Sequence, residues 1–175
     1  MSVRKTVRVD VQYAARPAGG LPSEREVSRW VKAALADRRE GAQLVVRFVG
    51  EAEGRELNER YRGKLGATNV LSFTYDGPGV LEPPFLGDIV VCAPVAQSEA
   101  SEQGKSLRAH WAHLVVHGVL HLRGYDHEHE RDASIMEALE REAMDALGFP
   151  DPYAAGDDAA PAIRPRARTA RDTGR

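Results

Sequence analysis

The alternation of apolar and polar residues predicts four strands. The valines within residues 3–11 alternate with polar residues, which is typical of a strand with one buried face. The other candidate strands are short runs rich in β-branched, aliphatic and aromatic residues, and turn residues such as Gly and Pro lie between some of them. Strands are therefore expected over residues 3–11, 44–49, 68–75 and 86–92.

Apolar positions at helical spacing, together with start and stop residues, predict five helices. Ser23 stands three residues before Glu26, a capping-box pattern that opens a helix, and Gly41 is expected to end that helix. Pro94 suits the first turn of a helix, and Gly148 is expected just past the end of the last one. The helices are therefore expected between Ser23 and Gly41 and over residues 51–61, 94–103, 107–123 and 131–147.

Two of these helices have a clear apolar stripe, which we expect to face the core. In the first helix the stripe consists of Val27, Trp30, Val31, Ala34 and Leu35. In the last helix it consists of Ile135, Met136, Leu139, Ala143 and Leu147.

The order of these elements predicts a single α/β (α+β) domain, in which helices pack on a mixed sheet of about four strands. A length of 175 residues suits one domain. Ala, Pro, Gly, Asp and Arg dominate from Ala154 onward, and large aliphatic residues become rare. The domain is therefore expected to span residues 1–153, followed by a disordered Ala/Pro/Arg-rich tail over residues 154–175.

The composition excludes several classes of protein. A single cysteine, Cys92, rules out an internal disulfide, which fits a reducing cytoplasm. The basic N-terminal residues lack the apolar run of a secretion signal, and no segment approaches the roughly 18 apolar residues of a membrane span. We therefore expect a cytoplasmic protein without membrane partners. The formal net charge of −2 gives no overall signal for nucleic-acid binding.

The histidines are clustered, because all six fall within residues 110–129. His117 and His121 are four residues apart, so a helix places them on one face about one turn apart. Gly124 can end that helix in a left-handed conformation, so that His127 comes round to supply a third nitrogen. Three ligands leave one tetrahedral position of Zn²⁺ open to water, whose pKa the ion lowers toward 7. The zinc site is expected at the end of this long helix.

The other polar residues of this region leave alternatives open. His110 and His113 share the helix face with the two proposed ligands, and we expect them to be core residues or to support the ligands. His129 could replace His127 as the third ligand. Asp126 could orient an imidazole or cap the helix that follows, and a role as catalytic base is the less favoured alternative.

The spacing His-x₃-His-x₂-Gly-x₂-His is also the skeleton of the metzincin protease motif. That motif requires a glutamate directly after the first histidine as the general base, and Gly118 occupies this position here. A metzincin-like zinc peptidase would therefore lack its base unless another part of the chain supplied one.

The segment from His117 to His127, HGVLHLRGYDH, resembles the signature of the YbeY family of bacterial endoribonucleases, also called rRNA maturation factors. Four further segments resemble family motifs and occur in the family's order. The resemblance extends over about residues 3–153. The segments are LNERYRGK at 57–64, TNVLSF at 68–73, GDI at 87–89 and GFPDPY at 148–153.

The resemblance implies a single-domain α/β fold that holds one zinc ion per chain on His117, His121 and His127. It implies metal-dependent hydrolysis of single-stranded RNA, with catalytic roles for Arg62, His117 and His121. The setting would be maturation of the 3′ end of 16S rRNA from its precursor and quality control of 70S ribosomes. Partners would then include the ribosome or small-subunit proteins.

Two small departures from the family pattern lie beside the predicted strand over residues 68–75. Ala67 and Thr74 stand where many relatives have proline. They concern loop rigidity and affect none of the proposed ligands.

A basic segment is the candidate for phosphate binding. Arg55, Arg60, Arg62 and Lys64 fall within ten residues, although a solvated helix end would also explain them. A guanidinium can bind a phosphate through two hydrogen bonds and stabilise transition-state charge. With the family resemblance we expect this role for Arg62. The general base is unassigned, because either an activated water or the RNA 2′-OH could be the nucleophile.

The predicted strand over residues 68–75 could contribute further hydrogen bonds to RNA. Thr68, Asn69 and Ser72 offer suitable polar groups. Ser72 and Phe73 face opposite sides of a strand, so the whole segment cannot line one cleft.

Two other functions stay open beside the endoribonuclease. One is a ribosome-assembly factor in which zinc fixes the last helices and catalysis is not essential. The other, less favoured, is the metzincin-like zinc peptidase.

Overall fold

The structure is a computed structural model, and it describes residues 5–16, 20–126 and 128–154. Within these residues, four strands form one mixed sheet in the order β1-β2-β4-β3. β2 pairs in parallel with both β1 and β4, and β3 pairs antiparallel with β4 at the edge of the sheet. The predicted four-stranded mixed sheet is confirmed. The strands are β1 (Val7–Tyr13), β2 (Ala42–Val49), β3 (Val70–Thr74) and β4 (Phe85–Cys92).

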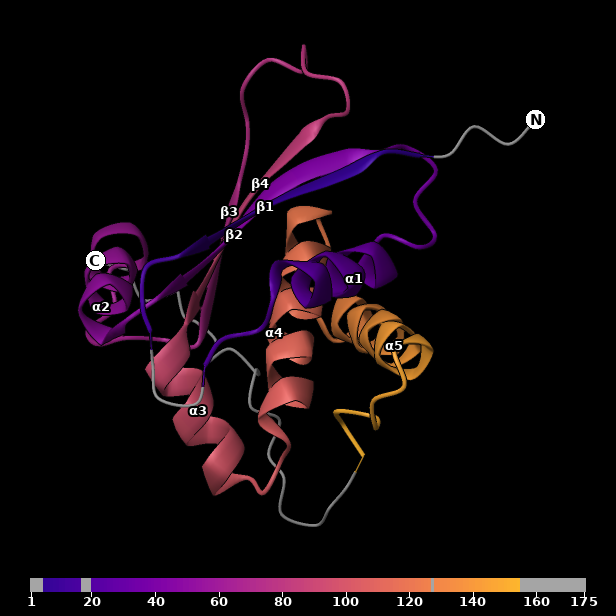
Figure 1. Cartoon of the computed structure of the whole chain (residues 1–175). Coiled ribbons are helices and arrows are strands. Elements are labelled where there is room, and N and C mark those ends of the chain that lie inside the picture. The colour runs from indigo at the N-terminus through magenta and orange to yellow at the C-terminus, as the bar shows by residue number, and fades with distance from the viewer. Residues whose placement is uncertain (1–4, 17–19, 127, 155–175) are drawn as a thin grey trace.

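Helices cover both faces of the sheet, as expected for an α/β domain (Figure 1). α1, α4 and α5 contribute to the main core against one face. Leu57 of α2 and Val95 of α3 pack against a smaller apolar cluster on the opposite face. The helices are α1 (Glu24–Ala34), α2 (Glu51–Arg62), α3 (Ala93–Glu102), α4 (Leu107–Leu122) and α5 (Glu130–Ala146).

α4 is the central helix of the molecule. Every residue from His110 to Leu120 is buried, so this helix has no solvent-facing stripe over that length. Its histidines are therefore enclosed by protein, where polar atoms need hydrogen-bond partners. The residues that supply these partners define the candidate site.

The beginning of α1 agrees with the sequence, but its end does not. The Ser23 side chain accepts from the Glu26 amide and the Glu26 side chain accepts from the Ser23 amide, so the predicted capping box is confirmed. The prediction that the helix ends at Gly41 is wrong, because α1 ends at Ala34. A Cβ at Gly41 would lie 2.3 Å from the Thr6 carbonyl oxygen, so this glycine allows a close backbone approach beside β1.

The predicted apolar stripes are confirmed in α1 and partly wrong in α5. All five stripe residues of the first helix are buried. In α5, Ile135 is 44% exposed, whereas Met144 and Glu140 are buried. The buried face of α5 is thus rotated from the prediction and includes a carboxylate.

Two expectations concern the ends of the chain. β1 begins at Val7, later than predicted, and Val3 lies outside the described residues. Of the predicted tail over residues 154–175, only Ala154 is among the described residues, so the tail stays a prediction. In the described part of the chain, no helix has the length and apolar character needed to cross a membrane.

Candidate active site

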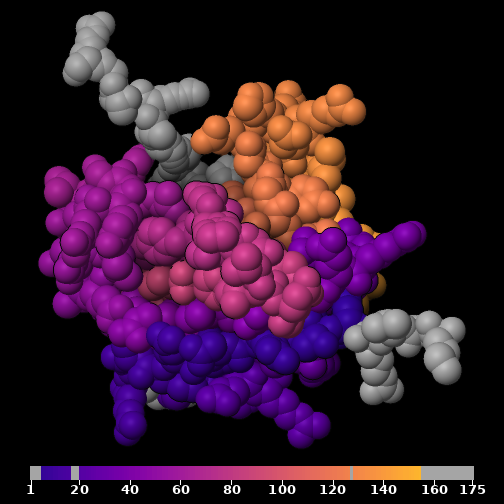
Figure 2. All heavy atoms as spheres, turned by 90° about the horizontal axis from the view of Figure 1, so that it is seen from above, coloured from indigo at the N-terminus to yellow at the C-terminus, as the bar shows by residue number. Residues whose placement is uncertain are grey.

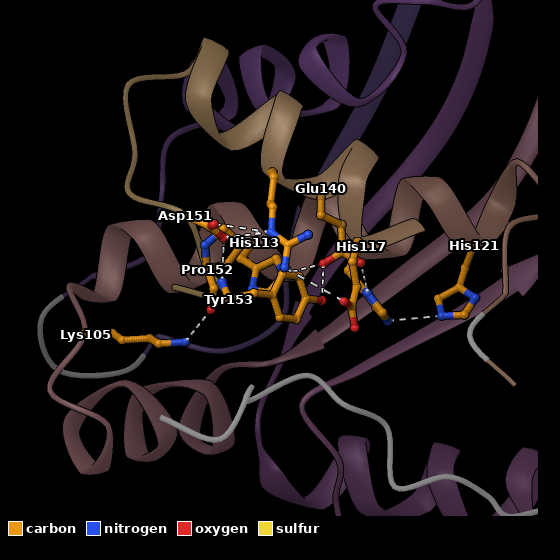
Figure 3. Close-up of polar contacts among 10 residues, drawn as sticks. Lys105, His113, His117, His121, Glu140, Asp151, Pro152 and Tyr153 are labelled. Carbon is orange, nitrogen blue, oxygen red and sulfur yellow. Dashed lines mark hydrogen bonds and ion pairs between the residues drawn. The ribbon is translucent and has the colours of Figure 1, made fainter. Parts of the chain in front are cut away.

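The structure brings His117 and His121 together at the C-terminal end of α4. Their Nε2 atoms lie 3.0 Å apart and their ring centroids 4.5 Å apart (Figure 3). Gly124 follows with a φ of +96°, and its amide donates to the His121 carbonyl at 2.9 Å. The helix therefore ends at the predicted glycine turn. His127, the third predicted ligand, lies outside the described residues.

The other ring nitrogen of His117 contacts a carboxylate that sequence reasoning missed. His117 Nδ1 lies 3.0 Å from Oε1 of Glu140, which comes from α5 (Figure 3). A carboxylate accepts at this position, so Nδ1 carries a proton, and Nε2 lies on the side of His121. A carboxylate that accepts from the non-ligating nitrogen is typical of histidines that bind metals.

Glu140 is only 1% exposed, and both of its carboxylate oxygens accept hydrogen bonds. Its Oε2 accepts from Nε2 of His113 and from the hydroxyl of Tyr153, each at 2.5 Å. Burial by itself would raise the pKa of Glu140, but the charge and hydrogen bonds of His117 and His113 outweigh it and lower the pKa. Burial lowers the pKa of His113. The lowered pKa of Glu140 fits a carboxylate that accepts the hydrogen bond from Nε2 of His113.

Tyr153 reaches the site from the C-terminal segment after α5. Its amide donates to Oδ1 of Asp151 at 2.8 Å, and Arg141 of α5 contacts Asp151 at 3.2 Å. Lys105 donates to the Pro152 carbonyl at 3.4 Å (Figure 3). Contacts from two parts of the chain therefore hold the segment beside the histidines.

His110 and His113 lie in the core, as expected. His113 supports the site through Glu140, whereas His110 Nε2 lies 3.1 Å from Oε1 of Glu99 in α3. Asn69 also donates to Glu99 at 3.1 Å and is 8% exposed. The Asn69 amide, which could have bonded to RNA, therefore donates to a carboxylate of the protein in this structure.

Arg62, the predicted phosphate ligand, lies at the open edge of the sheet. Its guanidinium donates to the Ser72 carbonyl and sits 5.2 Å from the centre of the Phe73 ring. The Ser72 hydroxyl contacts the carbonyl of Gly118 on α4 at 3.3 Å. Gly118 directly follows His117 in the sequence. Ser72 and Phe73 thus face opposite sides, as predicted, and Ser72 connects the Arg62 edge with the histidine helix.

Figure 2 shows the connection between β3 and β4 in pink, beside the residues that follow α4 in orange. The exposed side chains of this connection include Val80, which is 79% exposed, and Leu81, which is 46% exposed.

Gly118 has a packing role that explains why no acidic residue follows His117. A Cβ at Gly118 would lie 2.8 Å from Cγ2 of Ile89 on β4. A glutamate at this position would have to displace the Ile89 side chain on the sheet beneath it. The position that carries the general base in metzincins therefore cannot carry one in this packing.

A second group of potential metal ligands lies in the loop before α5 and in the first turn of that helix. In the described part of the chain, the ligand atoms of Asp126, His129 and Asp132 lie within 4.8 Å of one another, so this group could hold a metal ion. The Asp126 side chain accepts from the Glu128 amide at 2.7 Å, and the N-cap of α5 is His129. Asp126 therefore orders the loop and is not the N-cap of that helix.

The sequence did contain one signal for Glu140. It stands four residues after Met136 and three before Ala143, so it falls on the apolar stripe of α5. A carboxylate on a buried stripe needs polar partners. Tyr153 and Glu99 carried no such signal, because their partners are brought to them only by the tertiary fold.

Comparison with known proteins places the chain in a family. A family model described as endoribonuclease YbeY matches residues 20–148. A protein of Nitrosococcus oceani named endoribonuclease YbeY is 49% identical over 150 residues, which is 85% of this chain and 97% of the relative. The solution structure of TM1509 from Thermotoga maritima is similar with a TM-score of 0.53 and 22% identity, covering 82% of this chain and 92% of that one. This last likeness concerns the fold alone. The chain belongs to the YbeY endoribonuclease family.

Proposed function

We propose that this chain is a metal-dependent endoribonuclease that cleaves single-stranded RNA, with one zinc ion on His117, His121 and His127. Membership of the YbeY family supports the ribonuclease activity. The observation that carries the metal site is the pair of Nε2 atoms of His117 and His121, 3.0 Å apart at the end of α4.

The chemistry of these residues fits a bound metal ion. Tetrahedral ligands about 2.0–2.1 Å from Zn²⁺ lie roughly 3.3 Å from one another, which is close to the separation of the two histidine nitrogens. The hydrogen bond from His117 Nδ1 to Glu140 leaves Nε2 as the nitrogen that can bind a metal ion, which requires its deprotonated form. The role of His127 rests on its place after the Gly124 turn and on the family signature.

Each protein group has a distinct part in the proposed reaction. When bound, zinc would supply a Lewis acid for a phosphoryl oxygen and lower the pKa of a water ligand. Arg62 binds the phosphate and stabilises the negative charge that grows on it, since a guanidinium has five donors and its bond to Ser72 uses only part of them. The nucleophile is either water or the RNA 2′-OH.

The basic and aromatic side chains at the end of α2 support RNA as the substrate. The Arg60 guanidinium sits 5.5 Å from the centre of the Tyr61 ring, and Tyr61 is 55% exposed. Bases of single-stranded RNA stack on exposed aromatic rings, and arginines bind the backbone. Arg55 is engaged differently, because it pairs with Glu51 on the same helix at 3.1 Å.

We further propose the cellular role that the family resemblance implies. The enzyme would act in the cytoplasm on the 16S rRNA precursor, maturing its 3′ end, and in quality control of 70S ribosomes. The ribosome or small-subunit proteins would present the single-stranded substrate.

One observation favours the assembly-factor alternative as a second candidate. Glu140 connects α4, α5 and the C-terminal segment, so a metal ion beside it would also stabilise the last helices. In that case the loss of the metal would lower the melting temperature and function together, and catalytic changes that spare folding would have no effect.

The test is cleavage of a labelled single-stranded RNA by the purified protein and by the His117→Ala variant, each with and without a chelator. The proposal predicts cleavage that is lost on substitution and on chelation and regained when zinc is added to the wild type. Cleavage that survives His117→Ala would contradict the proposed site. The product ends identify the nucleophile, because attack by water leaves no 2′,3′-cyclic phosphate.

A further inference from the structure

Glu140 is a buried ionisable group that the proposed reaction does not use directly. Burying a carboxylate is costly unless it is paired and hydrogen-bonded. The structure surrounds this one with three donors, from His113, His117 and Tyr153. A carboxylate that needs so many partners suggests a role beyond packing. Its contact with His117 points to a role at the metal site.

The donors are divided between the two carboxylate oxygens in an uneven way. Oε1 accepts from Nδ1 of His117 at 3.0 Å. Oε2 accepts from both His113 and Tyr153. The two donors on Oε2 fix the rotation of the carboxylate, and this rotation aims Oε1 at Nδ1 of His117.

We propose that Glu140 is the positioning residue of the metal site and that Tyr153 and His113 hold its carboxylate in place. Glu140 keeps the proton of His117 on Nδ1 and fixes the plane of the imidazole, so that Nε2 is presented beside Nε2 of His121. This inference rests on the proposed function, because it assigns a role toward the metal ion that His117 is proposed to bind.

The proposal makes the C-terminal segment part of the site. Tyr153 is distant from the histidines in sequence, and its ring packs against His113 with centroids 5.4 Å apart. The Arg141 guanidinium sits 5.3 Å from the centre of the Tyr153 ring and also pairs with Asp151. Substitutions in this segment should therefore weaken metal binding by disturbing Glu140.

The test is the zinc dissociation constant of the full chain, measured by competition with a chromophoric chelator. Glu140→Gln keeps the shape of the side chain and removes its charge, and it should weaken zinc binding by about 10- to 100-fold. Tyr153→Phe removes only the hydroxyl, so a smaller loss, up to about 10-fold, is expected. Tyr153→Phe also keeps the proposal falsifiable if Glu140→Gln does not fold.

Met136→Val is the matched control, because Met136 is as buried as Glu140 on the same helix but belongs to the apolar core. The melting temperature of each metal-free variant is measured in parallel. Positioning predicts that the control lowers the melting temperature without changing zinc affinity, whereas Glu140→Gln and Tyr153→Phe weaken zinc binding. A purely structural role of Glu140 predicts lower melting temperatures and an unchanged zinc dissociation constant, which would overturn the inference.

The outcomes also separate this inference from the proposed function. If wild type binds zinc in a way that His117→Ala abolishes, the metal site stands, and unchanged affinity in Glu140→Gln and Tyr153→Phe refutes the positioning role alone. If zinc binding by the wild type does not depend on His117, both proposals fail.

Discussion

At the scale of single residues, the four histidines on one face of α4 differ in their partners. One pairs with a carboxylate of α3, two share a carboxylate of α5, and His121 contacts His117. Local spacing was enough to predict the adjacency of His117 and His121, because i and i+4 positions meet on any helix. The supporting carboxylates could not be predicted, since they come from other helices through tertiary contacts.

Arg62 offers the sharpest residue-level test of phosphate binding. Arg62→Ala should lower kcat/KM for RNA cleavage by about 100-fold with little change in melting temperature, because the side chain is exposed and acts on transition-state charge. Arg62→Lys should recover only part of the loss, since an ammonium group keeps the charge but lacks the planar pair of donors.

Arg55→Ala is the control for this effect, because Arg55 lies on the same helix and pairs with Glu51. It should leave kcat/KM nearly unchanged. An equal loss in Arg55→Ala and Arg62→Ala would mean that the segment acts only through its overall charge.

Gly118→Ala tests the close packing of α4 on the sheet. Helix propensity alone would favour alanine by about 1 kcal/mol. The added Cβ would meet Ile89 at 2.8 Å, so we expect a net destabilisation of about 1–3 kcal/mol in urea unfolding.

The companion change is Ile89→Ala, which removes the side-chain atoms that the new Cβ would meet. The cost of Gly118→Ala should shrink in the Ile89→Ala background, and a double-mutant cycle measures the difference. An equal cost in both backgrounds would show that contact with Ile89 is not the cause.

At the scale of elements, local signals predicted where most helices and strands lie and failed where a tertiary contact decides. The capping box located the start of α1, because both of its partners are close in sequence. The end of α1 was missed, and there the Ala34 carbonyl accepts a tertiary hydrogen bond from Arg123, at the end of α4, at 2.9 Å. The exposed side of α5 was also missed, since tertiary packing buries Met144 and leaves Ile135 exposed.

The contact between the ends of α1 and α4 gives an expected pH dependence. The hydrogen bond from Arg123 is the main cause that lowers the pKa of Asp37 below its ordinary value of 3.8. A lowered carboxyl pKa contributes stability above the unfolded value, and this contribution is lost as pH falls through the folded value. Asp37→Asn should therefore be less stable than wild type at pH 7, by less than about 1 kcal/mol because the carboxylate is half exposed.

The check is urea unfolding of wild type and Asp37→Asn across a pH series. The difference in free energy of unfolding should be constant near neutral pH, shrink in acid, and vanish once the pH is below the lowered pKa of Asp37. A difference that persists unchanged in acid would show that the Asp37 charge is not responsible.

At the scale of the whole molecule, the fold gathers distant segments around the end of α4. α5 and the C-terminal segment meet at Glu140, while β3 and the end of α2 meet at Ser72 beside Gly118. The sequence could predict the α/β class and the family, because these depend on pattern and on local motifs. The meeting of the segments depends on sheet order and helix packing, which no local pattern specifies.

Metal binding should therefore stabilise the molecule as a whole. A ligand that binds only the folded state at 100 times its dissociation constant adds about 2.7 kcal/mol to the free energy of unfolding. We expect zinc to raise the melting temperature of the wild type and to leave that of His117→Ala unchanged in differential scanning calorimetry. An equal rise in both proteins would place the stabilising metal elsewhere, for example on the group that contains His129.

The proposed zinc site is best tested by cleavage of single-stranded RNA by the zinc-loaded His127→Ala and His129→Ala variants, assayed beside the wild type. The two histidines are close in sequence, but only His127 is proposed to complete the site of His117 and His121. We predict that His127→Ala loses cleavage and that His129→Ala retains it. Cleavage retained by His127→Ala, or lost only in His129→Ala, would contradict it.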